Sequence, residues 1–146
     1  MEVAGFSMEK ADTEDIPAML QLWKSIPGLG EGDGERSLKV FMQRNPSTCL
    51  VLREQQRLIG TVLGGFDGHR GYIYHLAVDP AYQGRKLGKA LFNAVSSELI
   101  ALGAPKIHLF VYCDNQTAIN FYQGQMGEQR QDIYVFSWNH ERWNER

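Results

Sequence analysis

The sequence predicts an α/β fold (α+β in some schemes), a mixed sheet with helices packed on its faces. Three β-rich runs follow one another between Cys49 and Val78, separated by short turns, as in a meander. A long helical pattern then lies between this meander and a further alternating run, which is the order of a strand–helix–strand unit. Because the chain of 146 residues has no repeat and no long linker, we expect a single domain, residues 1–146.

The N-terminal part is predicted to hold a strand, 3–8, and two amphipathic helices. The first helix has an acidic first turn and an apolar face with the spacing i, i+3, i+4 and i+7, formed by Ile16, Met19, Leu20 and Trp23. A glycine-rich segment, 27–35, predicts a mobile loop. The second helix follows this loop and ends before Pro46.

The rest of the chain is predicted to complete the sheet. The meander strands are 49–53, 58–66 and 72–78. Residues 84–102 have helical spacing, and Gly103 supplies the C-terminal stop. After this helix we expect a strand at 107–111, a short helix that opens at Asn115, and a last strand at 133–138.

Charge and composition exclude several classes of protein. Lys and Arg total 15 and Asp and Glu total 17, a net charge of -2, which argues against a nucleic-acid partner. No apolar stretch reaches the length of a membrane span, and the acidic start does not resemble a signal peptide. We therefore expect a cytoplasmic protein without a membrane partner.

Cysteine and histidine spacing predicts no metal site. Cys49 and Cys113 lack CxxC spacing, so both are expected to pack as small hydrophobic side chains. The four histidines, at 69, 75, 108 and 140, show neither HExxH nor HxH spacing. Neither cysteine has the sequence context of a nucleophile, and GxSxG is absent.

A basic segment at the start of the long helix is the strongest candidate for binding chemistry. Its glycines let the backbone approach a ligand, and the N–H groups at a helix start attract anions. Arg85, Lys86 and Lys89 add cations beside those donors, so the segment predicts a diphosphate cradle. The alternative is a solvated basic first turn, although cations there oppose the helix dipole unless an anion is bound.

A second motif lies in the short helix that follows. Asn115 is a good N-cap residue, and Tyr122 stands seven residues later on the same helix face. A tyrosine in such a helix is most often a core aromatic with a satisfied hydroxyl.

These two motifs resemble those of the GNAT superfamily of N-acyltransferases. The run LAVDPAYQGRKLGKALF is similar to the family's acyl-CoA loop, Gln/Arg-x-x-Gly-x-Gly/Ala, in which Gln83 and Gly88 match and Lys86 replaces the first glycine. The run from Asn115 to Tyr122 resembles the family's Asn-x-x-Ala-x-x-Phe-Tyr. Met126 then stands where the family has glycine, so a different helix exit is expected. GGFDGHRG is similar to a small bacterial, YpeA-like branch.

The resemblance implies a GNAT-like mixed, mostly antiparallel sheet with helices on both faces and splayed central strands. It implies acetyl-CoA as co-substrate, lying between 72–78 and 107–113. One backbone N–H of the first strand would polarise the thioester carbonyl, and Tyr122 would protonate the departing CoA thiolate. The residues expected to bind the co-substrate are Leu76, Ala77, Val78, Gln83, Gly84, Arg85, Lys86, Leu87, Gly88, Lys89 and Asn115.

The group that deprotonates the amine stays open. Neither central strand carries the glutamate that many relatives use, and His75 is the candidate catalytic base because its ordinary pKa lies near 6.5. The alternatives are a strand histidine without a catalytic role, a water chain, or one of Tyr72, Tyr74, His108, Asp67, His69 and Glu35.

The sequence therefore predicts an N-acetyltransferase in which a primary amine, on a small molecule or a peptide, attacks acetyl-CoA directly in a ternary complex. The alternative is a catalytically weak acyl-CoA-binding regulatory module, favoured by Lys86 and by the missing strand carboxylate. Trp138 and Trp143 in the aromatic tail are a candidate homodimer contact, or else part of a frayed end.

Overall fold

The computed structural model describes residues 1–27, 29 and 34–140. The chain forms two compact units, Met1–Tyr112 and Cys113–Arg146. The first unit contains the sheet, and the part of the second unit that is described contains the helix α4 (Gln116–Gly124). Most of the loop predicted at 27–35, and Trp143, lie outside the described residues.

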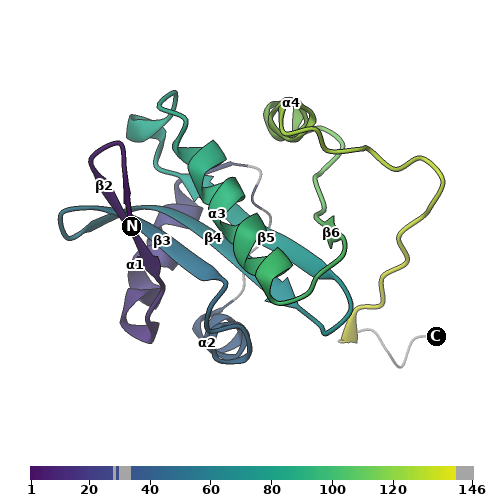
Figure 1. Cartoon of the computed structure of the whole chain (residues 1–146), viewed down its shortest axis with the longest axis horizontal. Coiled ribbons are helices and arrows are strands. Elements are labelled where there is room, and N and C mark those ends of the chain that lie inside the picture. Colours follow the sequence, from purple (N-terminus) through teal and green to yellow (C-terminus); the bar gives the residue numbers. More distant parts are fainter. Residues whose placement is uncertain (28, 30–33, 141–146) are drawn as a thin grey trace. The chain divides into compact units, whose positions relative to one another are not determined.

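The first unit is built on a six-stranded sheet in the order β1-β2-β3-β4-β5-β6 (Figure 1). The first five strands pair antiparallel, and β5 and β6 pair parallel. This is the mixed, mostly antiparallel sheet that the sequence predicts. The strands are β1 (Glu2–Val3), β2 (Phe6–Lys10), β3 (Cys49–Glu54), β4 (Arg57–Phe66), β5 (Gly71–Val78) and β6 (Ile107–His108).

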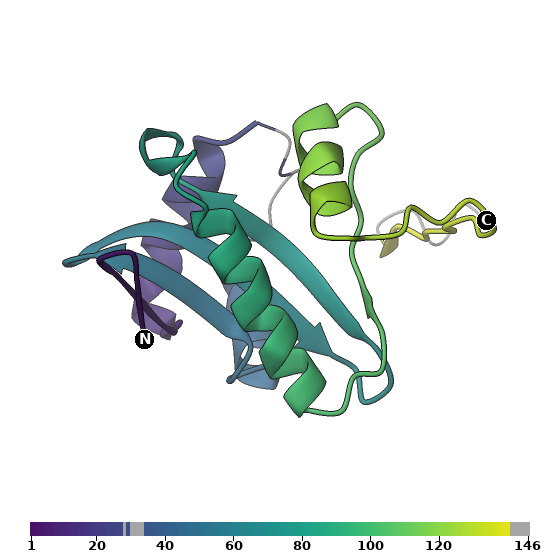
Figure 2. The ribbon, with the colours of Figure 1, turned by 45° about the horizontal axis from the view of Figure 1, so that its top comes forward.

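Helices cover both faces of this sheet, as predicted. On one face α3 (Leu87–Ala101) lies across the strands (Figure 2). Its Leu91, Val95 and Leu99 are buried in one core cluster with residues of these strands. On the other face α1 (Ile16–Lys24) and α2 (Glu35–Arg44) bury a second apolar cluster. Two short 3-10 turns, η1 (Thr13–Asp15) and η2 (Pro80–Tyr82), precede α1 and α3. None of the helices within the described ranges has the length and apolar character that crossing a bilayer requires.

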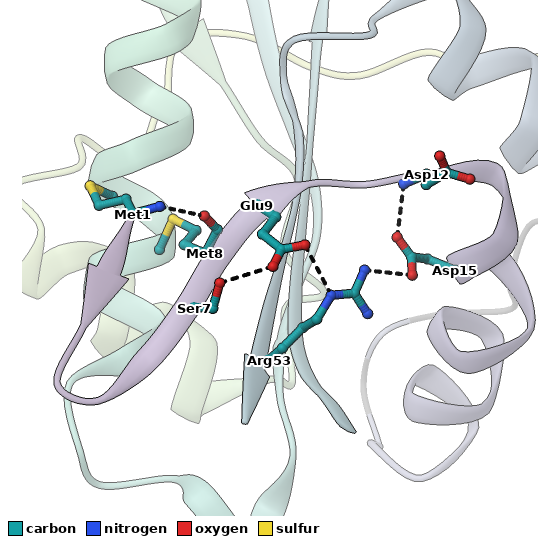
Figure 3. A network of polar contacts seen from close by, with 7 residues as sticks. All are labelled: Met1, Ser7, Met8, Glu9, Asp12, Asp15 and Arg53. Atoms are coloured by element: carbon teal, nitrogen blue, oxygen red, sulfur yellow. Dashed lines mark hydrogen bonds and ion pairs between the residues drawn. The ribbon is translucent and has the colours of Figure 1, made fainter. Parts of the chain in front are cut away.

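A polar network ties the start of the first helical segment to two strands (Figure 3). The Arg53 guanidinium lies 2.6 Å from Asp15 Oδ1 and 3.2 Å from Glu9 Oε2. The other Asp15 oxygen accepts from the backbone N–H of Asp12 at 2.8 Å, which completes a capping box. The acidic first turn read from the sequence is therefore also an anchor to β2 and β3.

Three of the predicted strands differ from the structure. The strand predicted at 3–8 is broken by a turn at Ala4 and Gly5 into β1 and β2, which pair antiparallel. The strand predicted at 107–111 pairs only over Ile107–His108, and the segment 133–138 has no strand conformation. An alternating pattern creates two faces, but a strand also needs a hydrogen-bonded neighbour, which sequence alternation does not supply. In 133–138 the apolar side chains stay exposed, Tyr134 by 90% and Phe136 by 77%.

The two cysteines differ, contrary to the expectation that both pack as hydrophobic side chains. Cys49 is buried in β3, and burial raises the pKa of its thiol to about 12. Cys113 is exposed.

Candidate active site

A β-bulge interrupts β5 near its C-terminal end. The register against β4 shifts between Thr61 and Leu63, so that His75 and Leu76 stand together opposite Val62. His75 has φ +49°, a left-handed conformation that costs a non-glycine residue about 1–2 kcal/mol. The sequence carried no glycine or other signal that would have predicted this bulge.

Buried side chains hold the bulge from the face that α1 covers. The Thr61 hydroxyl donates to the carbonyl oxygen of His75 at 2.9 Å and accepts from Trp23 Nε1 at 2.8 Å. The Trp23 and His75 rings stack with their centroids 4.2 Å apart and their planes at 17°. The predicted base therefore has its ring against an indole and its backbone bound to β4.

Beyond the bulge β5 has an open edge. It pairs with β6 at Gly71 and Tyr72, where β6 itself ends, and within the described residues no other strand pairs with the later part of β5 on that side. The predicted binding residues Leu76, Ala77 and Val78 lie in this later part of β5. An extended ligand with amide groups can pair with a strand edge of this kind, as an added strand does.

Two polar side chains organise the loop after β5, one within the loop and one against the strand. Asp79 accepts from the backbone N–H of Ala81 at 2.9 Å and so caps η2. The side-chain amide of Gln83 donates to the carbonyl oxygen of Val78 at 3.1 Å. Gln83, a predicted ligand contact, thus also holds the loop against the end of β5.

The helix α3 begins at Leu87, three residues later than the predicted start. Gly84 and Lys86 have φ values of +83° and +62°, which are incompatible with a helix. The first intrahelical bond runs from Ala90 N to Lys86 O, and no side chain caps this start. The backbone N–H groups of residues 87–89 therefore have no acceptor within the helix.

Three cations surround this helix start, as the sequence predicts. Arg85, Lys86 and Lys89 are exposed, and the first turn contains no acidic residue. The Arg85 guanidinium lies 5.2 Å from the centroid of the Tyr82 ring. By contrast, the Leu87 side chain is buried in the core, so this predicted contact could involve only its backbone.

In the second unit, α4 carries the other predicted motif. Asn115 caps the helix, its side-chain oxygen accepting from Ala118 N at 3.1 Å. Tyr122 lies on the same helix and is half-buried, and burial raises the pKa of its hydroxyl to about 12. The hydroxyl therefore keeps its proton at neutral pH.

The C-terminal end of α4 has the backbone geometry that glycine usually adopts, but Met126 occupies the left-handed position. Met126 has φ +68°, its N–H donates to Gln123 O at 3.0 Å, and Gly127 N donates to Tyr122 O at 2.9 Å. These are the two bonds of a Schellman motif, in which glycine normally occupies the left-handed position. The different helix exit expected from the sequence is not found, because Met126 itself takes the left-handed conformation.

The alternative bases take varied positions. Tyr74 packs edge-on against Phe41 with centroids 5.6 Å apart. Asp67 accepts two backbone N–H groups in an exposed turn, from Arg70 and His69, and these bonds lower its pKa. That makes Asp67 a weak base. Nowhere in the described ranges do three His, Cys, Asp or Glu residues gather as a metal site.

Most of this chain matches one known protein family, and curated relatives share this similarity. Residues 16–127 match the family model of the Acetyltransferase (GNAT) family. Acetyltransferase ECA0875 of Pectobacterium atrosepticum is 37% identical over 111 residues, which cover 75% of this chain and 79% of that protein.

Solved structures share the fold. Ard1 from Thermoplasma volcanium superposes with a TM-score of 0.76 at 20% identity, covering 84% of this chain and 82% of that one. The PaiA N-acetyltransferase from Thermoplasma acidophilum, in complex with coenzyme A, gives a TM-score of 0.72 at 18% identity, with 82% and 87% coverage.

Proposed function

This chain belongs to the acetyltransferase (GNAT) family, and we propose that it transfers the acetyl group of acetyl-CoA to a primary amine by direct attack in a ternary complex. The family assigns acetyl transfer. The observation that carries the assignment to this chain's own residues is the uncapped, basic start of α3, which directly follows the open edge of β5 in the chain.

The start of α3 is the proposed diphosphate site. Backbone N–H groups of residues 87–89 have no acceptor in the helix, and a phosphate oxygen can take that role. Arg85, Lys86 and Lys89 supply positive charge around these donors. Gly84 and Gly88 keep side-chain bulk away from the approaching anion.

The open edge of β5 is the proposed site of the pantetheine arm and the thioester. The arm contains two amides, which can pair with the backbone of residues 76–78 as a strand would. A backbone N–H directed at the thioester carbonyl stabilises the negative charge that develops there during attack, an effect of about 3–4 kcal/mol per donor.

Tyr122 is the proposed general acid. The amine nitrogen forms a bond to the acetyl carbon, the carbon–sulfur bond breaks, and the sulfur leaves as a thiolate that takes the hydroxyl proton. The new amide nitrogen then releases its extra proton, which balances the proton that Tyr122 gave up and restores its hydroxyl. A pKa of about 12 keeps this proton on Tyr122 until the thiolate forms. Asn115, which caps the same helix, is the proposed contact to the pantetheine arm.

His75 is the proposed base for the attacking amine, directly or through a water. A primary ammonium has an ordinary pKa near 10, so the amine must lose a proton before it attacks. The acceptor is a primary amine on a small molecule or a peptide.

A screen of amines tests the proposal. The chain is incubated with acetyl-CoA and each amine of a panel, and CoA thiol release is followed at steady state. Amine-dependent release with formation of the N-acetyl product is the expected result. Saturable binding of acetyl-CoA without turnover on any amine would instead favour the regulatory module.

A further inference from the structure

The two partners of the Thr61 hydroxyl determine the direction of its hydrogen bonds, because one can only donate and the other can only accept. The indole N–H of Trp23 can only donate, and the carbonyl oxygen of His75 can only accept. The Thr61 hydroxyl lies between them, 2.8 Å from the first and 2.9 Å from the second. Its single hydrogen must therefore be directed at His75 O, and its lone pair at Trp23.

This hydrogen bond fixes the orientation of one peptide group. In a trans peptide the C=O and the following N–H point in opposite directions. The carbonyl of His75 is bound to Thr61, which belongs to β4. The N–H of Leu76 therefore points away from the Thr61 hydroxyl, and on the side of β5 opposite β4 lies the edge where pairing with β6 has ended.

We propose that Thr61, held in turn by Trp23, is a positioning residue for acetyl transfer. It fixes the peptide between His75 and Leu76 so that the Leu76 N–H meets the thioester carbonyl oxygen. This inference rests on the proposed function and names both the donor and the side chain that orients it.

Side-chain contacts are needed to fix this peptide group, because the backbone conformation of His75 is energetically unfavourable on its own. His75 adopts φ +49° without being glycine, so the bulge persists only where its surroundings enforce it. Thr61 is fully buried and Trp23 is 7% exposed, so water has little access to replace the hydroxyl once it is removed. The peptide group would then be free to rotate, and the Leu76 N–H would no longer point at the thioester carbonyl oxygen.

The test uses acetyl-CoA labelled with carbon-13 at the carbonyl, because this probe requires no known acceptor. The infrared band of the bound carbonyl is compared between the wild-type protein and Thr61→Val, which keeps the shape and removes the hydroxyl. A directed N–H lowers the carbonyl frequency, so the band is expected at higher wavenumber in the variant. With an active amine, we expect kcat to fall about 10- to 100-fold while the Kd of CoA changes less than about 2-fold.

Thr48→Val is the matched control. Thr48 is as buried as Thr61, and its hydroxyl also donates to a backbone carbonyl of the sheet, that of Gly64, away from the bulge. This variant should lose stability without moving the carbonyl band. Thr61→Ser retains the hydroxyl and should restore both the band and kcat. If Thr61→Val does not fold, Trp23→Phe removes the donor behind Thr61 and should shift the band in the same direction by less.

The outcomes separate this inference from the function on which it rests. A wild-type protein that does not bind acetyl-CoA overturns the proposed function, and this inference with it. Binding with the same carbonyl band in wild type and Thr61→Val leaves the function standing and overturns the role of Thr61. A band that moves equally in Thr48→Val also overturns it, because the effect would then follow general loss of a buried hydroxyl.

Discussion

The starts of α3 and α4 differ in the one feature that decides whether a helix end can bind an anion. At α4 the side chain of Asn115 accepts from the backbone N–H of Ala118, so the chain itself satisfies one of the N–H groups of the first turn. At α3 no side chain caps the helix, and Lys86 occupies the N-cap position in a left-handed conformation. One helix start carries a side-chain cap, and the other, which is the proposed diphosphate site, carries none.

Both helices also carry a strained residue where the family has glycine. Lys86 precedes α3 with φ +62°, and Met126 follows α4 with φ +68°. Lys86 brings positive charge to the uncapped helix start. The Met126 side chain is 91% exposed, so it adds little packing in return for the same backbone strain. Equal backbone strain therefore accompanies a proposed binding role at Lys86 and no proposed role at Met126.

Removal of the Tyr122 hydroxyl has the largest expected effect, and it tests whether α4 supplies chemistry. Tyr122→Phe should lower kcat about 100-fold or more, because general acid catalysis contributes about 10²–10⁴-fold. The Kd of CoA should change less than about 2-fold, as measured by isothermal titration calorimetry. An unchanged kcat would show that α4 does not supply the general acid and that this helix has a structural role.

The pH profile of kcat gives a second measure of the same residue. The raised pKa of Tyr122, about 12, means that the hydroxyl is protonated below that pH and loses its proton only above it. We therefore expect no loss of kcat from this group as pH rises from 7 to 10, whereas an ordinary tyrosine would begin to lose its proton near pH 10. A falling limb that is present in the wild type near pH 9 and shifts in a Tyr122 variant would contradict this assignment.

Charge reversal at the start of α3 has the next largest expected effect. It should raise the stability of the free protein and lower its affinity for CoA. Lys86→Glu places a carboxylate where the helix dipole favours it, so the free protein should gain up to about 1 kcal/mol of stability. The same charge should weaken CoA binding about 10-fold, equivalent to about 1.4 kcal/mol. Lys39→Glu makes the same change in net charge on α2, which packs on the other face of the sheet from α3. Equal weakening of CoA binding in both variants would mean that net charge, not the helix start, binds CoA.

The sequence predicted the parts of this site that depend on local pattern. The meander strands, α1, α2, α3 and the Asn115 cap follow from spacing and capping preferences. The bulge at His75 did not follow, because it arises from the register of β5 against β4 and from contacts with Trp23, which lies far away in sequence. The failed strand at 133–138 has a related cause, since a run of β-branched and aromatic residues does not specify its pairing partner.

Glycine substitution gives the smallest and sharpest test of the comparison between the two strained residues. Met126→Gly and Lys86→Gly should each change stability by the same amount, a gain of up to about 1 kcal/mol measured by urea unfolding, because glycine adopts positive φ without strain. Only Lys86→Gly should also weaken CoA binding, since it alone removes a cation from the helix start. If both variants bind CoA as the wild type does, the charge of Lys86 contributes nothing to binding. The strained conformation of Lys86 at the start of α3 would then serve CoA binding no more than that of Met126 at the end of α4.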